Sequence, residues 1–282
     1  MDGILPAVWV SGKLTDAHCA SVPVFDHGIT VGDGVFETAK IVRGRPFALR
    51  RHLERLTRSA VGLGLPSPDV KRVRAAIDAV IEANDLTENT GAVLRVTYTA
   101  GDGPLGSGRS NGSTSTLIVA AATMRAWAPS SRVLIVPWVR NERGALSGLK
   151  TTSYGENVVA LAAAHRAGAD EAIFANSRGE LCEGTGTNVF VVVEGQVLTP
   201  PLASGCLAGI TRQLVLETGL ANETDLPIEA LRAASEAFLT SSTRDVHPIA
   251  FVDGAPLAAA PGPVTTKVAR AFAELVASST DP

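Results

Sequence analysis

Apolar and polar residues alternate along several short stretches in the first half of the chain. The longest is residues 35–42, where odd-numbered and even-numbered side chains would point to opposite faces. A period of two is typical of a β-strand, and here it predicts a strand with two differently used faces. The same reasoning predicts strands at residues 8–10 and 92–99, and the apolar run at residues 116–122 predicts a fully buried strand.

Helical spacing replaces this alternation in two places. A helix is predicted over residues 49–62, and its apolar stripe is Leu49, Leu53, Leu56 and Ala60. Its basic side chains are mostly explained as a solvated face, namely Arg50, Arg51, His52, Arg55 and Arg58. A second helix is predicted over residues 70–84, after two prolines that interrupt the chain.

Strands and helices follow one another more closely in the second half. Strands are predicted at residues 133–136, 171–175 and 189–193. Helices are predicted at residues 158–167, 230–234 and 264–278, and a further helix opens within residues 204–213 and runs through residue 217. Residues 123–131 contain Trp127, Pro129 and two serines, a composition typical of a linker. We therefore expect a small N-terminal α/β domain at 1–122, an interdomain linker at 123–131, and a large C-terminal domain at 132–282 that carries Lys150.

Composition narrows the class of protein. The chain has 282 residues, 45% of them hydrophobic, so it can bury a large core without disulfides. Its net charge of −3 does not favour a nucleic-acid partner. The three cysteines, Cys19, Cys182 and Cys206, are odd in number and scattered, so neither a disulfide framework nor a metal site is expected. No apolar run reaches the length of a membrane span, and the first residues lack a signal peptide, so we expect a cytoplasmic protein.

Residues 146–190 carry the main candidate chemistry. Lys150 lies just after a glycine and before an alanine-rich helix, and Glu183 lies in a segment rich in glycine and threonine. Taken singly, Lys150 would be a solvated surface charge and Glu183 a turn or capping carboxylate. Together, an amine and a carboxylate at the ends of neighbouring elements suit a pyridoxal phosphate enzyme. In such an enzyme a lysine forms a Schiff base with the cofactor and an acid binds its pyridine nitrogen.

Two motifs give this hypothesis a family. Lys150-Thr-Thr-Ser-Tyr154, followed by Glu183-Gly-Thr-Gly-Thr-Asn-Val-Phe190, resembles the class IV aminotransferases, and the resemblance extends over nearly the whole chain. It implies the D-amino-acid aminotransferase-like fold, fold type IV, with a small α+β domain and a larger α/β barrel-like domain. It also implies pyridoxal 5′-phosphate as cofactor and a homodimer whose loops complete each other's sites.

The resemblance assigns cofactor contacts residue by residue. Arg55, in a His-x-x-Arg-Leu segment, would bind the cofactor phosphate, as would the backbone amides and hydroxyl of Ile210 and Thr211. Leu207 would pack against the pyridine ring, and Ser242 would add a phosphate contact. Tyr154 matches the tyrosine that hydrogen-bonds the ring hydroxyl if a gap of one residue is allowed.

The resemblance also indicates substrate contacts. Phe36 and Thr38 follow Gly32-Asp-Gly34 and would line the substrate pocket, and Thr243 would meet the substrate carboxylate. D-Amino-acid enzymes usually carry an arginine after the strand that ends near Tyr98, which is missing here. Arg95, or Arg109 in the next loop, would replace it, although an interdomain salt bridge explains Arg95 equally well.

The predicted reaction is transamination between an amino acid and a 2-oxo acid, with Lys150 as general base and acid. The motifs favour D-amino acids as donors, with (R)-amines as a further option. Aminodeoxychorismate lyase, which makes 4-aminobenzoate and pyruvate, is the alternative. A branched-chain enzyme is more distant, because Val31 stands where those enzymes carry tyrosine.

Two other motifs are set aside. Residues 101–106 spell G-x-G-x-x-G after a strand, but a dinucleotide site needs a helix there and the composition predicts a loop. Ser147-Gly-Leu-Lys150 spells the S-x-x-K motif of serine acyl enzymes, but the companion Ser-Asp-Asn and Lys-Thr-Gly segments do not occur.

Overall fold

Packing divides the chain into two compact units. The computed structural model describes residues 3–86, 91–110, 112 and 114–282. The first unit comprises Met1–Arg125, Leu149–Tyr154 and Ser279–Pro282, and the second comprises Ala126–Gly148 and Gly155–Ser278. Lys150 is expected in the C-terminal domain, whereas packing groups its segment, Leu149–Tyr154, with the first unit. The expected domain boundaries at residues 122 and 132 remain a prediction.

The first unit is built on a sheet that, within the described residues, has six strands in the order β2-β1-β6-β5-β3-β4. The strands are β1 (Ala7–Val10), β2 (Lys13–Asp16), β3 (Gly34–Val42), β4 (Arg45–Pro46), β5 (Ala92–Thr99) and β6 (Thr116–Thr123). All neighbours pair antiparallel. The strands with clear alternation or a long apolar run are confirmed. The short edge strands β2 and β4 were not predicted.

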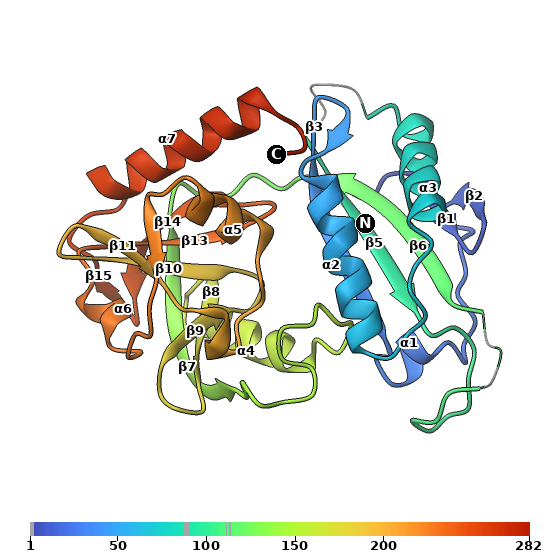
Figure 1. Ribbon diagram of the computed structural model, residues 1–282, viewed down its shortest axis with the longest axis horizontal. Coiled ribbons are helices and arrows are strands. Elements are labelled where there is room, and N and C mark those ends of the chain that lie inside the picture. The colour runs from blue at the N-terminus through green and yellow to red at the C-terminus, as the bar shows by residue number, and fades with distance from the viewer. Residues whose placement is uncertain (1–2, 87–90, 111, 113) are drawn as a thin grey trace. The chain divides into compact units, whose positions relative to one another are not determined.

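Two helices cover one face of this sheet (Figure 1). They are α2 (Leu49–Gly62) and α3 (Val70–Ala83), which agree with the predicted helices, and a short α1 (His27–Thr30) precedes β3. The Asp69 carboxylate caps α3 by accepting from the backbone N–H groups of Lys71 and Arg72. Leu56 of α2 and Ile77 of α3 are at most 1% exposed and share one core with Leu94 of β5. Apolar burial therefore holds both helices against the sheet.

The inner side of α2 also carries charge. The expectation of a solvated basic face holds for Arg50 and Arg58, which are exposed, but not for His52. His52 and Arg55 are only 3% and 5% exposed, because both reach Glu37 on β3. Arg55 donates from Nε and Nη2 to the two carboxylate oxygens at 2.7 Å each, and His52 Nδ1 lies 2.6 Å from Oε2. Burial opposes the charge of Glu37, but Arg55 and His52 outweigh it and hold its pKa well below the usual range. Burial also lowers the pKa of His52.

The segment Leu149–Tyr154 pairs with the start of β3. The Phe36 N–H donates to the Lys150 carbonyl at 3.0 Å, and the Thr152 N–H donates to the Gly34 carbonyl at 2.8 Å. Nearby, Gly32 has φ +70°, and a Cβ there would lie 2.7 Å from Ser153 Oγ, so glycine is needed for this close approach. This backbone pairing is the physical reason that Lys150 belongs to the first unit.

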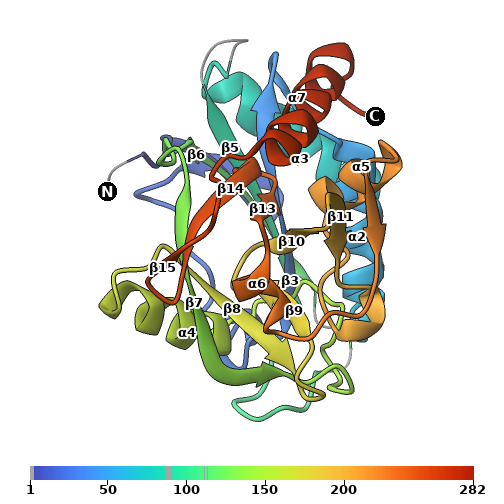
Figure 2. The same ribbon diagram turned by 90° about the vertical axis from the view of Figure 1, so that its left-hand side faces the viewer.

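The second unit contains a sheet of nine strands among the described residues. They are β7 (Ser131–Arg140), β8 (Glu171–Asn176), β9 (Leu181–Gly184), β10 (Asn188–Val193), β11 (Gln196–Thr199), β12 (Ala221–Glu223), β13 (Glu236–Ser241), β14 (Asp245–Val252) and β15 (Ala255–Pro256). Because β9 pairs with both β8 and β10, the path β10-β13-β14-β7-β8-β9 closes on itself (Figure 2). The unit is therefore barrel-like, and the expected fold class is confirmed.

Helices pack around this barrel-like sheet. They are α4 (Gly155–Arg166), the 3₁₀ helix η1 (Leu202–Ser204), α5 (Ile210–Glu217), α6 (Ala230–Ala233) and α7 (Pro263–Ser278). Phe190 of β10 and Phe238 of β13 stack with ring centroids 4.7 Å apart, and both are fully buried. The Glu236 carboxylate accepts from the first backbone N–H groups of α7. No helix in the described ranges is long and apolar enough to cross a membrane.

Replacing Glu37 by glutamine should destabilise the protein, because the Arg55 guanidinium would stay buried without its carboxylate. Breaking a buried pair by removing one partner typically costs about 3–5 kcal/mol. We expect Glu37→Gln to lower the free energy of unfolding at neutral pH by this amount, as measured by urea denaturation. Glu54→Gln on the same helix is the matched control, because Glu54 is 52% exposed and pairs with Arg50 at the surface. That change should cost less than about 1 kcal/mol.

The difference between wild type and Glu37→Gln should shrink in acid. The pKa of Glu37 in the folded protein lies below its ordinary value of 4.5. Its stabilisation is therefore complete above that pH and is lost as the pH falls towards the folded-state pKa. A difference that instead widens as the pH is lowered would contradict this assignment of the charge.

Candidate functional site

Three residues predicted to meet substrate share one face of the first unit's sheet. In the β3–β5 register, Thr38 lies opposite Arg95, and Phe36 lies opposite Thr97. Opposed residues of an antiparallel pair point to the same side, so Phe36, Thr38 and Arg95 share a face. Glu37 points to the other face, towards α2. The two faces of β3 are therefore used differently, as its alternation predicts.

Lys150 joins this face through its side chain. Its Nζ lies 4.3 Å from the centroid of the Phe36 ring, and Cζ of Arg95 lies 3.7 Å from the same centroid. The Tyr154 ring meets Phe36 edge-on, with centroids 5.2 Å apart. Phe36 therefore contacts two cations and an aromatic ring, an arrangement in which the electron-rich ring face stabilises positive charge.

The lysine's backbone is fixed as well. Its N–H donates to Ser59 Oγ on α2 at 3.1 Å, and its carbonyl accepts from Phe36. On the same helix, two nitrogens of Arg55 are held by Glu37, so the guanidinium expected to bind phosphate has a set orientation.

Arg109, the second candidate for binding the substrate carboxylate, is instead paired with Asp33. Its Nε and Nη2 form a two-pronged pair with Asp33 at 2.7 and 2.6 Å, and it also donates to the carbonyls of Leu63 and Gly64. It thus ties the loop after β5 to the Gly32-Asp-Gly34 turn and to the end of α2. Asn111 and Ser113 of that predicted loop lie outside the described residues.

Glu183 lies in β9 of the second unit and is held by two donors. Arg140 Nε donates to Oε1 at 3.1 Å, and the Leu207 N–H donates to Oε2 at 2.9 Å. The Arg140 guanidinium also lies 4.0 Å from the centroid of the Phe174 ring. Sequence reasoning missed Arg140, because the predicted strand stops at residue 136 whereas the observed β7 continues to Arg140.

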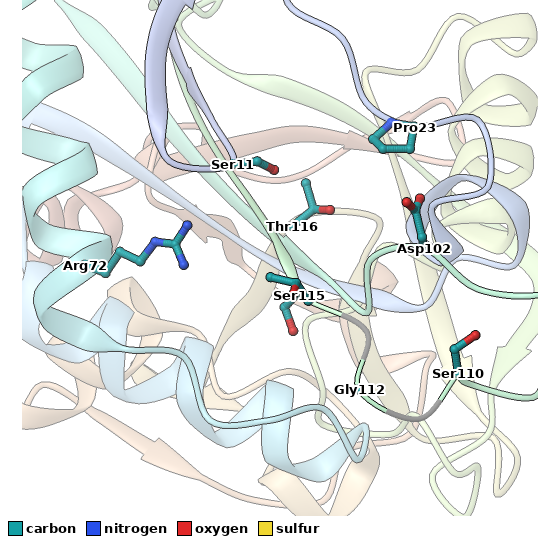
Figure 3. A pocket seen from close by; sticks show the side chains of 9 residues that line it. Ser11, Pro23, Arg72, Asp102, Ser110, Gly112, Ser115 and Thr116 are labelled. Atoms are coloured by element: carbon teal, nitrogen blue, oxygen red, sulfur yellow. The ribbon is translucent and has the colours of Figure 1, made fainter.

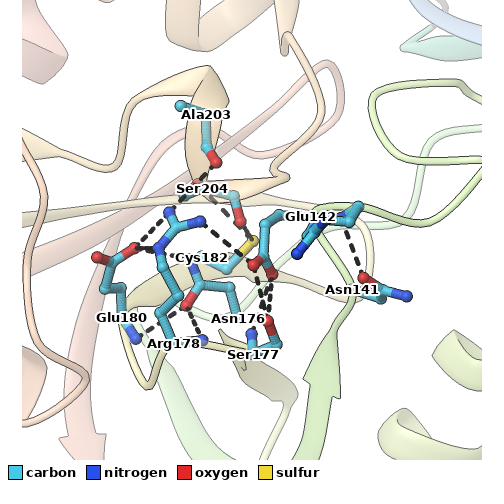
Figure 4. Close-up of polar contacts among 10 residues, drawn as sticks. Asn141, Glu142, Asn176, Ser177, Arg178, Glu180, Cys182, Ala203 and Ser204 are labelled. Atoms are coloured by element: carbon cyan, nitrogen blue, oxygen red, sulfur yellow. Dashed lines mark hydrogen bonds and ion pairs between the residues drawn. The ribbon is translucent and has the colours of Figure 1, made fainter.

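The chain around Glu183 is anchored by a polar network (Figure 4). Arg178 donates to Glu180 at 2.6 Å, to Glu142 at 3.2 Å and to the Ala203 carbonyl at 3.3 Å, which joins the β8–β9 turn to η1. Cys182 is buried beside this network, and burial raises the pKa of its thiol. The thiol therefore stays protonated and unreactive.

The N-terminus of α5, where the phosphate contacts are predicted, has no side-chain cap. The helix begins at Ile210, and its N-cap, Gly209, provides no side-chain hydrogen bond. Thr211 lies inside the first turn rather than at the N-cap position. A Cβ on Gly209 would lie 1.9 Å from Asn188 Oδ1, so glycine is required there. Helix N-termini with open N–H groups favour phosphate.

Ser242 and Thr243 form the turn between β13 and β14, both half-buried. The Thr243 carbonyl accepts a hydrogen bond from Trp127 Nε1 at 3.0 Å. On β13, the Thr240 hydroxyl is buried and has no hydrogen-bond partner among the described residues.

The predicted site residues are divided between the two units. The first unit holds Phe36, Thr38, Arg55, Arg95, Lys150 and Tyr154, and the second holds Glu183, Leu207, Ile210, Thr211, Ser242 and Thr243.

A separate polar cavity of about 540 Å³ lies in the first unit (Figure 3). Its lining includes Arg72, Asp102 and the hydroxyls of Ser11, Ser115 and Thr116. The residues that line it do not include any of the predicted site residues. The candidate catalytic groups are therefore found elsewhere in the molecule.

Comparison with known proteins agrees with this chemistry. The sequence profile described as "Amino-transferase class IV" matches residues 34–252. The chain is 33% identical over 261 residues to a putative branched-chain-amino-acid aminotransferase of Methanocaldococcus jannaschii, covering 88% of both chains. It is 30% identical over 295 residues to a D-alanine aminotransferase of Listeria innocua, covering 95% of both.

A solved structure is similar over almost the whole chain. It is the PLP-bound form of a hypothetical aminotransferase from Mycobacterium tuberculosis, with a TM-score of 0.86 and 26% identity. The match covers 96% of this chain and 99% of that one. The chain therefore belongs to the class IV aminotransferase family, and its cofactor is pyridoxal 5′-phosphate.

Proposed function

We propose that this protein is an aminotransferase in which Lys150 binds the cofactor covalently and moves the proton at the substrate α-carbon. The observation that carries the proposal is the position of the Lys150 amine, 4.3 Å from the Phe36 ring centroid, on a segment whose backbone is bound on both sides. Pyridoxal phosphate, when bound, supplies the aldehyde that takes the amino group and the ring that accepts electrons. A lysine amine beside the α-carbon is suited to general base and acid work.

The donor groups of the second unit fit the cofactor. Hydrogen bonds from Arg140 and from the Leu207 N–H orient the Glu183 carboxylate, and a carboxylate is an acceptor suited to the pyridine N–H. The uncapped first turn of α5, with Ile210 and Thr211, offers N–H groups and a hydroxyl to the phosphate. Ser242 adds a hydroxyl from the β13–β14 turn, and Leu207 supplies an apolar contact for the ring.

The first unit supplies the remaining contacts. Arg55 holds the phosphate through its guanidinium, which Glu37 keeps in one orientation. Tyr154 contacts the cofactor ring hydroxyl. Phe36 and Thr38 line the substrate pocket, and Arg95 adds a permanent positive charge beside them.

Two classes of amino donor follow from the relatives. A branched-chain amino acid is the first candidate, because the relative at 33% identity bears that name and the Phe36 face is aromatic and partly apolar. D-Amino acids, which the motifs favour, are the second candidate, supported by the D-alanine aminotransferase at 30% identity. A 2-oxo acid is the acceptor in either case.

A homodimer in the cytoplasm completes the proposal. Val24, Phe25, Ile29 and Leu105 of the first unit are 53–74% exposed, although they are large and apolar. The Phe25 carbonyl accepts from the Gly103 N–H, so the two stretches that carry them are adjacent. Exposed apolar patches of this kind often mark protein interfaces.

Half-reaction spectra should identify the donor. The yellow holoprotein is mixed with L-leucine, D-alanine, (R)-phenylethylamine or aminodeoxychorismate without an acceptor, and its absorbance is followed. We expect L-leucine to convert the cofactor in a single turnover and the others to react at least about tenfold more slowly. Release of pyruvate from aminodeoxychorismate over many turnovers would instead identify a lyase and refute transamination.

Replacing Lys150 by alanine should remove both covalent attachment and proton transfer. We expect Lys150→Ala to lose the borohydride-reducible cofactor absorbance and to lower turnover by about 10²–10⁴-fold, the usual effect of losing a general acid–base group. Lys267→Ala, at an exposed lysine of α7, is the control and should retain both. Ordinary turnover in Lys150→Ala would overturn the assignment.

A further inference from the structure

The peptide between Thr243 and Arg244 is held at both ends. Its carbonyl accepts from Trp127 Nε1 at 3.0 Å, and its N–H donates to Ser241 Oγ at 3.2 Å. Because a peptide unit is planar, two such hydrogen bonds set the orientation of the whole unit. They also fix the position of the Thr243 Cα, from which its N–H and hydroxyl project.

Arg244 holds the Trp127 indole, which is the donor in the hydrogen bond to the Thr243 carbonyl. Its guanidinium lies 3.8 Å from the centroid of the Trp127 ring, and its side chain is only 6% exposed. Nη1 donates to Ser131 Oγ at 2.8 Å, and Nη2 lies 3.8 Å from the Glu171 carboxylate. The indole is therefore held by stacking on the cation, while its N–H is directed at the Thr243 carbonyl.

Glu171 extends the network to the segment that follows Glu183. It is 2% exposed and accepts from the Thr185 N–H at 3.1 Å and from the Thr187 hydroxyl at 3.4 Å. One buried carboxylate thus binds both the Gly-Thr-Gly-Thr segment and the arginine that supports the β13–β14 turn. A hydrogen-bond network of this kind rigidifies both segments and fixes their positions relative to each other.

We propose that Trp127 and Arg244 are positioning residues for the substrate carboxylate. They act by holding the turn so that the N–H and hydroxyl of Thr243 face the carboxylate. This inference rests on the proposed function, in which Thr243 meets the substrate. Neither residue touches the reacting atoms, so their loss should weaken recognition of the carboxylate and leave the chemistry at the amine intact.

The test compares binding with and without a carboxylate. Trp127→Phe keeps a ring for Arg244 to stack on but removes the N–H donor. In the holoenzyme we expect it to raise the dissociation constant of 4-methylpentanoate, followed by cofactor absorbance, and the KM for leucine by about tenfold. This is the effect of losing one hydrogen bond at a group left without a partner. The half-reaction of 3-methylbutan-1-amine, which is leucine without its carboxylate, should change less than about twofold.

A second variant and a control separate positioning from folding. Arg244→Lys keeps the charge but loses the planar stack. It should likewise raise the KM for leucine while leaving the half-reaction of the amine nearly unchanged. The double variant should cost less than the sum of the two single changes, because both act on one turn. Trp138→Phe makes the same replacement at an exposed tryptophan of the same unit and should change none of these values.

The outcomes distinguish this inference from the proposed function. The positioning role is wrong if Trp127→Phe impairs the reactions of leucine and of the amine equally. It is also wrong if neither the dissociation constant of 4-methylpentanoate nor the KM for leucine changes in that variant. Failure of the proposed function shows earlier and in the wild type, as a holoprotein that carries no borohydride-reducible absorbance.

Discussion

The pairing of Leu149–Tyr154 with β3 is the constraint on which the proposed chemistry of this chain depends. A lysine side chain is long and flexible, so its amine can be positioned only if its backbone starts from a fixed place. Here the N–H and carbonyl of Lys150 are both bound, one to α2 and the other to β3. The amine then meets Phe36, a side chain of the same strand. Its position is therefore set by a sheet rather than by a loop, as a site requires when small displacements change the rate.

In the second unit, hydrogen bonds likewise fix the positions of the predicted site groups. Glu183 is held by Arg140 and by the Leu207 N–H, and the Leu207 carbonyl in turn accepts from Asn188. The carboxylate, the apolar side chain beside it and the start of α5 are thus parts of one hydrogen-bonded frame. Groups fixed before a ligand arrives need little reorganisation when charge develops, which is the main electrostatic advantage of a protein site.

Periodicity predicted those elements that have a complete apolar stripe or face and missed the shortest strands. The helix at Leu49–Gly62 and the strand at Ala92–Thr99 were predicted with their observed bounds, because each has a complete apolar stripe or face. The strands β2, β9, β12 and β15 were not, since two to four residues are too few to show a period. The same limit explains Arg55 and His52. A basic helix face is normally solvated, and only the fold shows that a carboxylate on β3 lies beneath it.

The motifs predict which segments are catalytic, but substrate choice depends on much less of the chain. Relatives named for branched-chain and D-alanine substrates are 33% and 30% identical to it, so overall similarity does not separate them. A hundredfold preference needs only about 2.7 kcal/mol, which one or two contacts can supply.

The hand of an amino acid is selected by where its carboxylate is held. With the amino group on the cofactor and the α-hydrogen facing the lysine, the carboxylate and the side chain have two places left, and exchanging them converts one hand into the other. In the proposed site, the Thr243 turn, which Trp127 and the buried Arg244 hold, takes the carboxylate and so leaves the other place to the substrate's side chain.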